Sequence, residues 1–485
     1  MMVRLRVNGV EVLVNGGASL LDAARAAGYD VPTLCHLKKT GALTACMVCV
    51  VRDLATGRTL PSCAARAEEG MDIATDDDGL RAARREALSL ILNEHAGDCE
   101  GPCARICPAG LNVPRMLRLL QAGEVGAAAR MARRDLVFPA TLGRVCTAPC
   151  ERVCRRTQYD GAVAIRTSHG IAAETFLDAP VEPGFCAAPT GKSAGVVGAG
   201  LAGLAAAREL VSRGHACRIY EKTGGACAGL RAVSPEKLPP AVLDAEIAAV
   251  LELGVEARFN CAVGADLSLD ELLQEHDAVI IACGMAAPRD PRVFTAVEEP
   301  LHVRAVGSGK RAAAHADAWL SDRPAPVDKP FNSMLGRLEE AELADYAVER
   351  RLPEAEGPDG LVREAARCLH CDCLKLASCK LRRYAEEHGL GPQMKRTLPR
   401  PAVSPILRAG RVLFEPGKCI RCGICVALTA ASEGPGMTFT GRGLASRVGP
   451  ALGATLAEGL GGLAETCVRV CPTAALAFDG TEESE

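Results

Sequence analysis

The chain has 485 residues, which exceeds one ordinary domain, so we expect three to five modules. Its 59 acidic and 56 basic residues nearly balance, and no run of like charge indicates nucleic acid or a membrane surface as a partner. Residues 1–14 alternate apolar and polar side chains instead of forming a leader, and no long apolar stretch follows. These features predict a cytoplasmic protein without a membrane segment.

Cysteine is the unusual component, because the chain contains 24 thiols. Disulfides need an oxidising compartment, whereas thiols grouped at two- and three-residue spacings in a cytosolic protein indicate metal ligands. Nineteen of the cysteines fall in such groups. We expect the other five to be small buried apolar side chains. These five are Cys186, Cys217, Cys227, Cys261 and Cys283.

The N-terminal residues predict a β-hairpin followed by a short helix. Residues 3–14 form two alternating runs around Asn8-Gly9, which is typical of a type I′ turn. Ser19, with Asp22 three residues later, predicts a capped helix N-terminus.

Composition divides the rest of the chain. Residues 80–180 have helical periodicity, and the Pro-containing segment 178–192 is a linker. Residues 193–320 alternate strand and helix, which is the pattern of a doubly wound sheet. Two further Pro-rich stretches, 323–330 and 399–405, set off the C-terminal cysteine regions.

The first thiol group has the spacing C-x10-C-x2-C-x13-C and follows the predicted hairpin and helix. It consists of Cys35, Cys46, Cys49 and Cys63. Four thiolates on a loop and a distal strand can hold two irons, and a zinc site is the weaker alternative. The region 1–95 resembles the N-terminal 2Fe-2S domain of the large iron-sulfur subunit of complex I and of iron-only hydrogenases.

The second thiol region contains two runs of cysteines. The first run is Cys99, Cys103 and Cys107-Pro108, and the second is Cys146, Cys150 and Cys154. The step His95-x3-Cys99 has the form with which the complex I family introduces its next cluster. The remaining pattern resembles the helical double-cluster domain of the glutamate synthase small subunit and of dihydropyrimidine dehydrogenase.

That resemblance implies that two 4Fe-4S clusters take ligands from both runs. Cys99, Cys103 and Cys154 are assigned to one cluster, and Cys107, Cys146 and Cys150 to the other. His95 is the candidate fourth ligand of the first cluster. For the second, the family has Glu or Gln after a Gly-Ala-Val motif, and here residues 161–163 lead to His169. Imidazole can ligate iron, while a surface or helix-capping role is the alternative for both histidines.

Two more thiol groups lie near the C-terminus. One has the spacing C-x2-C-x-C-x5-C, compact enough to hold one 4Fe-4S cluster alone, with zinc as the alternative. It consists of Cys368, Cys371, Cys373 and Cys379. The other is the ferredoxin-like run Cys419, Cys422 and Cys425.

The ferredoxin-like run lacks its fourth local cysteine, since Thr429 occupies that position. Threonine is a poor iron ligand, so a distant thiol is needed. The complex I family uses a remote Cys-Pro, and Cys471-Pro472 stands where that pattern places it; Cys467 is the competing candidate. The segment 439–449 also resembles that family.

A glycine-rich turn predicts a dinucleotide site. An apolar strand leads into G-x-G-x-x-G and an Ala-rich helix, and the next strand ends at an acidic residue that can accept from ribose hydroxyls. This context makes the motif specific, and an empty Rossmann turn is the alternative. The residues assigned to the cofactor are Gly198, Gly200, Gly203, Glu221, Lys222, Gly225, Leu230, Gly284 and Glu298.

The surroundings of this turn resemble the FAD-binding half of the glutamate synthase small subunit. The resemblance includes Gly224-Gly225, residues 235–239 and residues 277–284. That family inserts a second Rossmann domain for NADPH, which this chain lacks. Residues 296–298, Ala-Val-Glu, replace the family's Gly-Gly-Asp, so retention of FAD is left open.

The sequence thus predicts a multidomain α+β and α/β chain. Its expected parts are a β-grasp 2Fe-2S ferredoxin-like domain at 1–80, a helical domain with two 4Fe-4S clusters at 81–180, a Rossmann-type FAD domain at 190–325 without the NAD(P)H insert, a linker and compact 4Fe-4S segment at 326–400, and a ferredoxin-like 4Fe-4S domain at 401–485.

The predicted function is that of an electron-transfer subunit, with one 2Fe-2S cluster, about four 4Fe-4S clusters and FAD. We expect catalytic and electron-accepting subunits as partners, such as an NADH-oxidising flavoprotein, a formate dehydrogenase or a hydrogenase. No catalytic residue is identified. The alternatives are a self-contained NAD(P)H-dependent oxidoreductase and a zinc-rich scaffold or cluster carrier.

Overall fold

The computed structural model describes residues 2–179, 185–297, 299, 301–326, 330–346, 357–391 and 400–480. The chain folds into two compact units. The first unit comprises residues 1–100, 329–346 and 371–485, and the second comprises residues 101–328 and 347–370. The division into five domains stays a prediction.

The N-terminal part of the first unit is a five-stranded sheet with the order β2-β1-β7-β5-β6. Its strands are β1 (Met2–Val7), β2 (Val10–Asn15), β5 (Val50–Asp53), β6 (Thr59–Pro61) and β7 (Asp72–Ala74). Asn8 and Gly9 both have positive φ, 49° and 80°, as a type I′ turn requires, so the predicted hairpin is confirmed. Helix α1 (Leu20–Ala26) begins at a capping box of Ser19 and Asp22, which is also confirmed.

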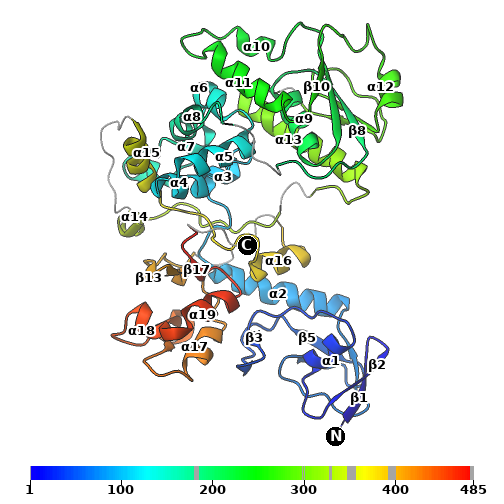
Figure 1. The fold of residues 1–485 in the computed structure, drawn as a ribbon. Coiled ribbons are helices and arrows are strands. Elements are labelled where there is room, and N and C mark those ends of the chain that lie inside the picture. The colour runs from blue at the N-terminus through cyan, green and yellow to red at the C-terminus, as the bar shows by residue number, and fades with distance from the viewer. Residues whose placement is uncertain are drawn as a thin grey trace. The chain divides into compact units, whose positions relative to one another are not determined.

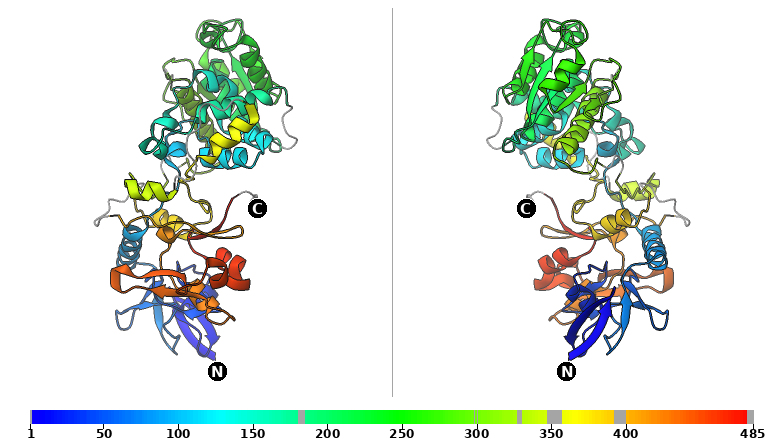
Figure 2. Two further views of the ribbon diagram at one scale, coloured as in Figure 1. Left: turned by 90° about the vertical axis from the view of Figure 1, so that its left-hand side faces the viewer. Right: turned by 90° about the vertical axis from the view of Figure 1, so that its right-hand side faces the viewer.

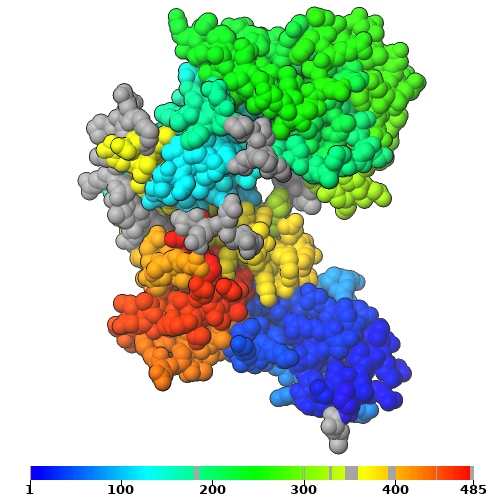
Figure 3. Space-filling view, in the orientation of Figure 1, coloured from blue at the N-terminus to red at the C-terminus, as the bar shows by residue number. Residues whose placement is uncertain are grey.

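The C-terminal part of the first unit contains short strands and helices around the last cysteines. Its residues are the orange and red atoms of Figure 3. Strands β13 (Leu407–Ala409), β14 (Val412–Phe414) and β17 (Leu476–Phe478) form one sheet, and β15 (Met437–Thr440) pairs with β16 (Arg447–Pro450). The helices are α14 (Glu340–Tyr346), α16 (Lys380–Glu387), α17 (Ile424–Thr429), α18 (Leu456–Leu460) and α19 (Ala464–Val470).

One apolar core joins these two parts of the first unit. It includes Leu88 and Leu92 of α2 (Asp78–Glu94), Tyr384 of α16, Ile424 of α17 and Leu34 of the N-terminal loop. The same core contains four cysteines from three different thiol groups. They are Cys35, Cys46, Cys379 and Cys422.

The second unit has a helical part (Figure 1), which carries the cysteines from Cys103 to Cys154. Its helices are α3 (Pro102–Ile106), α4 (Val113–Gln121), α5 (Val125–Leu136), α6 (Pro139–Val145), α7 (Pro149–Arg152), α8 (Ile165–Thr175) and α15 (Gly357–Ala366). Helix α15, although distant in sequence, packs against α4 and α8. The core is dense, with Met116, Phe138 and Ala132 fully buried.

The second unit also contains a five-stranded parallel sheet with the order β10-β9-β8-β11-β12 (Figures 1 and 2). Its strands are β8 (Ser193–Val197), β9 (Ala216–Tyr220), β10 (Glu256–Arg258), β11 (Ala278–Ile281) and β12 (Val293–Thr295). The helices are α9 (Leu201–Ser212), α10 (Ala228–Arg231), α11 (Pro240–Leu251), α12 (Leu269–Glu275) and α13 (His302–Leu320). The predicted doubly wound sheet over residues 193–320 is therefore confirmed.

Candidate iron-sulfur and nucleotide sites

The N-terminal thiols lie close together on a loop before β5 and directly after β6. All four are buried, with exposed fractions of 1 to 5%. The Sγ atoms of Cys35 and Cys46 are 3.4 Å apart, and Cys49 and Cys63 form a second hydrogen-bonded pair. In each pair one thiol donates to the other, which lowers the pKa of Cys46 to about 6 and that of Cys49 to about 7. Four converging soft donors, two of them readily ionised, suit a 2Fe-2S cluster.

The ferredoxin-like thiols line a mainly apolar cavity in the first unit. Cys419, Cys422 and Cys425 lie on its wall with Cys467 and Cys471, and the rest of the lining includes Phe414 and Val448. Burial raises the pKa of Cys419 and Cys422 to about 12 and that of Cys425 further, and the nearby charge of Cys471 adds to each. The chemistry of this donor set, all thiol within an apolar shell, fits an iron-sulfur cluster.

The two candidate fourth thiols differ in their surroundings. Cys471 ends helix α19 and its charge acts on all three thiols of the run, whereas the charge of Cys467 is felt by Cys425. Cys467 is fully buried in the neighbouring core, and burial raises its pKa to about 11. These surroundings favour Cys471 as the ligand, which we take up as a proposal below.

Thr429 has a structural role at the position where a local fourth cysteine is lacking. Its hydroxyl donates to the Cys425 carbonyl at 2.9 Å and accepts from the Met437 amide at 2.8 Å. The side chain is 1% exposed. Thr429 therefore links the end of α17 to β15.

The compact C-terminal group lies beside a residue of the N-terminal half. The Cys373 amide donates to the Cys99 carbonyl at 3.0 Å. Lys418 is buried next to it, with Nζ 2.9 Å from the Asp372 carbonyl and 2.7 Å from Glu415. Burial opposes the charge of Lys418, but Glu415 and Cys373 raise its pKa overall. A buried cation thus faces Cys373.

A second lysine connects the compact group to the ferredoxin-like site. Lys375 Nζ donates to the carbonyl of Val468 and to that of Cys471. Burial lowers its pKa, while the charges of Cys471, Cys379 and Cys373 oppose that shift. Thiol spacing did not indicate either lysine, because Lys375 occupies an unspecified position between Cys373 and Cys379 and Lys418 directly precedes Cys419.

In the second unit, three thiols gather at the ends of α6 and α7. Cys146 directly follows α6, Cys150 lies in α7, and Cys107 follows α3. Burial raises the pKa of Cys146 and Cys150, and the charge of Cys107 contributes to both shifts. The structure therefore brings together the three thiols that the sequence assigned to one cluster.

The two candidate histidine ligands are both buried, at 7% exposure for His95 and 4% for His169. His169 Nδ1 lies 3.1 Å from the Pro139 carbonyl. Burial lowers the pKa of His169 to about 4, so the ring is neutral. His95 ends helix α2 in the first unit. For both residues the role of ligand stays a prediction.

The nucleotide turn lies at the carboxyl end of the parallel sheet. Gly198 follows β8 with φ of 106°, and a Cβ at Gly203 would lie 1.9 Å from the Gly198 carbonyl. Both positions therefore require glycine for the protein's own packing. Gly200 differs, because a Cβ there would meet nothing within 4 Å and its φ is an ordinary −75°. Open space beside a helix N-terminus fits the approach of a pyrophosphate.

The other predicted cofactor residues surround this turn. Glu221 follows β9 and accepts from the Ala199 and Thr223 amides, both at 2.8 Å. Burial alone would raise its pKa, but these hydrogen bonds lower it overall. Gly225 also has open space beside it, and Leu230 is buried in α10. Lys222 is exposed, Gly284 follows β11 with φ of 74°, and Glu298 lies outside the described residues.

Helix α13 packs between the nucleotide turn and a cysteine loop. A Cβ at Gly309 would lie 2.0 Å from the Ala202 carbonyl in the first turn of α9. A Cβ at Gly307 would lie 2.2 Å from the carbonyl of Pro108, the neighbour of Cys107. One turn of α13 thus separates the candidate pyrophosphate site from the candidate cluster.

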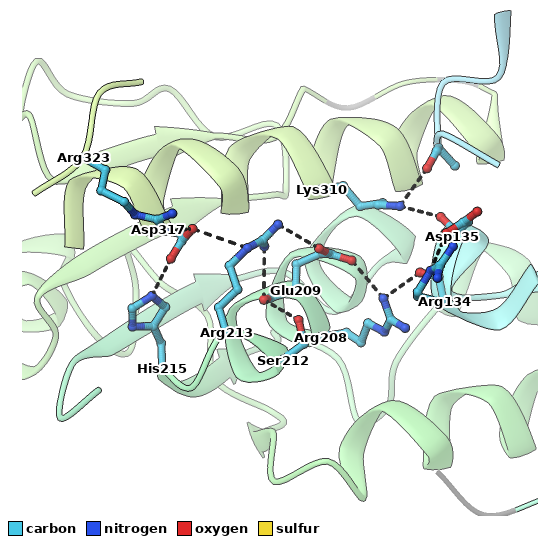
Figure 4. A network of polar contacts seen from close by, with 11 residues as sticks. Arg134, Asp135, Arg208, Glu209, Ser212, Arg213, His215, Lys310, Asp317 and Arg323 are labelled. Atoms are coloured by element: carbon cyan, nitrogen blue, oxygen red, sulfur yellow. Dashed lines mark hydrogen bonds and ion pairs between the residues drawn. The ribbon is translucent and has the colours of Figure 1, made fainter. Parts of the chain in front are cut away.

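A buried polar network holds this arrangement (Figure 4). Lys310 Nζ donates to the carbonyls of Ala109 and Asp135 at 2.8 and 2.5 Å, and Arg208 donates to the Arg134 carbonyl at 2.8 Å. Both cations come from the Rossmann part, and the acceptors come from the helical part. The sequence indicated a nucleotide domain at 190–325 but not this contact with the cysteine loop.

The five scattered cysteines do not share one environment. Cys217, Cys227 and Cys261 are buried at 3 to 5% exposure, as predicted. The prediction is wrong for Cys283, which is exposed after β11, and Cys186 is half-buried. Within the described residues, no three His, Cys, Asp or Glu side chains are arranged around a single metal ion. No described helix is long and apolar enough to cross a membrane.

The fold and these sites define an iron-sulfur protein with a dinucleotide-binding domain. Residues 1–78 match a family described as 2Fe-2S iron-sulfur cluster binding domain. Residues 93–179 match dihydropyrimidine dehydrogenase domain II, 4Fe-4S cluster, and residues 196–251 match NAD(P)-binding Rossmann-like domain. The predictions of 2Fe-2S, 4Fe-4S and Rossmann-like domains are confirmed.

Three relatives show where such domains are found. Over 331 residues the chain is 28% identical to the NADP(+)-dependent formate dehydrogenase subunit beta of Moorella thermoacetica, covering 57% of this chain and 46% of the relative. Over 187 residues it is 33% identical to the NADPH-Fe(3+) oxidoreductase subunit beta of Geobacter sulfurreducens, covering 38% and 28%. Over 186 residues it is 32% identical to the NADPH glutamate synthase small chain of Bacillus subtilis, covering 38% of each.

The predicted resemblance to the glutamate synthase small subunit is therefore confirmed. All three relatives are named as parts of oxidoreductases. The chain spans less than half the length of each of them.

Proposed function

We propose that this chain is an electron-transfer subunit of a multisubunit oxidoreductase, relaying electrons among FAD, its iron-sulfur clusters and a partner catalytic subunit. Its own cofactors would be one 2Fe-2S cluster, about four 4Fe-4S clusters and FAD. The partner would be an NADH-oxidising flavoprotein, a formate dehydrogenase or a hydrogenase. The names of the relatives support this class of function.

The observation that carries the proposal is the shared apolar core of the first unit. Cys35 and Cys46 of the N-terminal group, Cys379 of the compact group and Cys422 of the ferredoxin-like group all belong to it. The charge of Cys46 contributes to the raised pKa of Cys422, so the two thiols are near each other. Three candidate cluster sites thus border one apolar, buried region, which suits electron exchange better than three separate structural metal sites.

Residues of the second unit would hold the flavin and its neighbouring cluster. Gly198, Gly200 and Gly203 would admit the pyrophosphate, and Glu221 would accept from the ribose. When bound, FAD would supply exchange between electron pairs and single electrons. The chain's contribution is the short spacing across α13, set by Gly307 and Gly309.

The short connection between β11 and α13 favours this proposal over a self-contained NAD(P)H oxidoreductase, because a second nucleotide domain would need many more residues there. Between Ile281, the end of β11, and His302, the start of α13, the described residues form one strand, β12. The Rossmann sheet is therefore closed without an inserted domain. A reduced nicotinamide would have to come from a partner.

The ligand assignment that we propose for the last site is Cys419, Cys422, Cys425 and Cys471. Cys471 is preferred to Cys467 because its charge reaches all three partners. The N-terminal site would use Cys35, Cys46, Cys49 and Cys63, and Cys107, Cys146 and Cys150 would share a cluster. His169 remains the proposed fourth ligand of that cluster.

Anaerobic purification tests the proposal. We expect about eighteen irons per chain, one FAD, and several paramagnetic signals after dithionite. Addition of NADH or NADPH to the isolated chain should leave the flavin oxidised, and addition of the copurifying partner should allow its reduction. Rapid bleaching of the flavin by NADPH alone would support the self-contained enzyme, and a zinc-loaded, colourless chain would support the scaffold.

A further inference from the structure

The compact motif C-x2-C-x-C-x5-C is divided between the two units. Cys368 belongs to the second unit, whereas Cys371, Cys373 and Cys379 belong to the first. The motif Cys99-x3-Cys103 is divided in the same way, with Cys99 in the first unit. Neither run of cysteines therefore stays within one packed body, although the sequence suggests that each does.

In the first unit, Cys99 lies against the compact group. Its carbonyl accepts from the Cys373 amide at 3.0 Å. Burial raises the pKa of Cys99 to about 12, and the charges of Cys373 and Cys379 add to that shift, so the three thiols are neighbours. The Ser333 amide lies 3.3 Å from Cys99 Sγ, as an N–H donor to a cluster thiolate would.

His95 and Lys418 border the same place. An ideal Cβ built at Gly97 would lie 3.3 Å from His95 Nε2 and 2.7 Å from Lys418 Cγ. Lys418 in turn faces Cys373. The segment 95–99 therefore lies beside the buried lysine that faces Cys373.

In the second unit, the residue before Cys368 is bonded to the loop that follows Cys154. Arg156, two residues after Cys154, is fully buried and donates to the carbonyl of Arg367 at 2.8 Å. Arg367 donates to the Gly161 carbonyl at 2.8 Å and pairs with Asp160 at 3.2 Å. These bonds fasten the end of α15 to the loop that carries Cys154.

Glu364 makes further contacts that hold the C-terminal end of α15. Glu364 accepts from the Ala164 amide at 2.8 Å and pairs with Arg367 at 2.5 Å. Helix α3, which carries Cys103, packs against α7, which precedes Cys154. Cys103, Cys154 and Cys368 all border the core of the second unit.

We infer that the ligands are divided by unit: Cys99, Cys373 and Cys379 hold one 4Fe-4S cluster in the first unit, and Cys368 joins Cys103 and Cys154 in another in the second. This replaces both the pairing of Cys99 with Cys103 and Cys154 and the self-contained compact cluster. The inference rests on the proposed iron-sulfur function. It also accounts for the shortage of thiols in the helical domain, because Cys368 supplies one that the runs at 99–154 lack.

Paired substitutions test this assignment of ligands. If two cysteines bind the same cluster, replacing both should remove no more iron than replacing either one. Cys99→Ala, Cys373→Ala and Cys154→Ala should each remove one cluster, about four irons. Cys99→Ala with Cys373→Ala should lose no more iron than either alone, whereas Cys99→Ala with Cys154→Ala should lose twice as much. The opposite pattern would overturn the inference. Cys186→Ser, at a half-buried cysteine outside every group, is the control and should keep all iron.

A second variant keeps every thiol, since loss of a cluster can unfold its surroundings. Ser333→Pro removes the amide that faces Cys99, which should lower the reduction potential of that cluster. The electron paramagnetic resonance signal that shifts should be the one that Cys373→Ala abolishes. A shift in the signal that Cys154→Ala abolishes would contradict the division. If the wild-type chain contains no iron, the proposed function is wrong. If it contains all of its iron but the double variants lose iron in the opposite pattern, only this inference is wrong.

Discussion

The two units place their thiols in different kinds of interior. In the first unit, cysteines of three groups are members of the apolar core itself, beside Leu88 and Phe331. In the second unit, a parallel sheet and its helices form a core in which most members are aliphatic, and a buried charge network ties the parts together (Figure 4). Cluster binding and folding should therefore be coupled in the first unit and largely separable in the Rossmann part of the second.

Removal of iron should have the largest effect. It should lower the hydrogen-exchange protection of the first unit more than that of the second. Chelation under anaerobic conditions removes the metal–sulfur bonds that would link the segments of the first unit, so its amides should lose protection from hydrogen exchange. The strands β8, β9 and β11 should stay protected, because their burial needs no metal. Equal loss of protection in β5 and β8 would contradict the comparison.

Next in size are substitutions at the nucleotide turn. Gly203→Ala places a methyl group on the Gly198 carbonyl and should destabilise the second unit by about 3 kcal/mol, measured by denaturant unfolding. Gly200→Ala is its matched control, because open space surrounds that position. It should leave stability unchanged while lowering flavin occupancy. Normal flavin content in Gly200→Ala would argue against a pyrophosphate there.

A smaller effect is expected at Glu246, a buried carboxylate of α11 that accepts from the Ala140 and Thr141 amides at the start of α6. Burial raises its pKa to about 7 from an ordinary 4.5. Stability from this group is fully present below about pH 4.5 and declines as pH rises through about 7, by about 3 kcal/mol.

The Glu246→Gln variant isolates this effect. It keeps an acceptor for one amide but does not ionise, so the decline between pH 5 and 8 should become shallower. Thermal unfolding of both proteins across that range provides the measurement. Identical pH profiles would show that Glu246 is not the responsible group.

The smallest effect should come from a surface ion pair of the second unit. Arg231 lies 2.7 Å from Asp244, and both side chains are about half exposed. Arg231→Ala should cost less than about 1 kcal/mol, because solvent and salt screen such pairs. A larger loss would mean that the Arg231 bond to the Ala226 carbonyl supports the nucleotide site.

Local features were predictable from sequence because their causes are local. The Asn8-Gly9 turn, the Ser19 capping box and the glycine turn at 198–203 each depend on a few adjacent residues. Within-group thiol spacing likewise indicated the thiols that gather near the N-terminus and those that line one cavity at Cys419, Cys422 and Cys425.

Features that depend on contacts between residues far apart in the sequence were not predictable. The neighbours of Cys99 are set by residues 333 and 373, and no spacing rule joins them to it. The surroundings of Lys310 and Gly307 follow from packing of α13 on the cysteine loop. Cys283 is exposed because it lies just after the end of β11, and the cysteine itself does not determine where that strand ends.

Helix α13 has no side chain beyond Cα at Gly307 and Gly309, where it touches the Pro108 and Ala202 carbonyls. Electron tunnelling weakens steeply with each added ångström of separation. On the proposed function, the absence of two methyl groups would keep the electron route between the nucleotide turn and the Cys107 loop about as short as one helix permits. Any bulkier residue at either position would lengthen that route, so natural variation there should be confined to glycine.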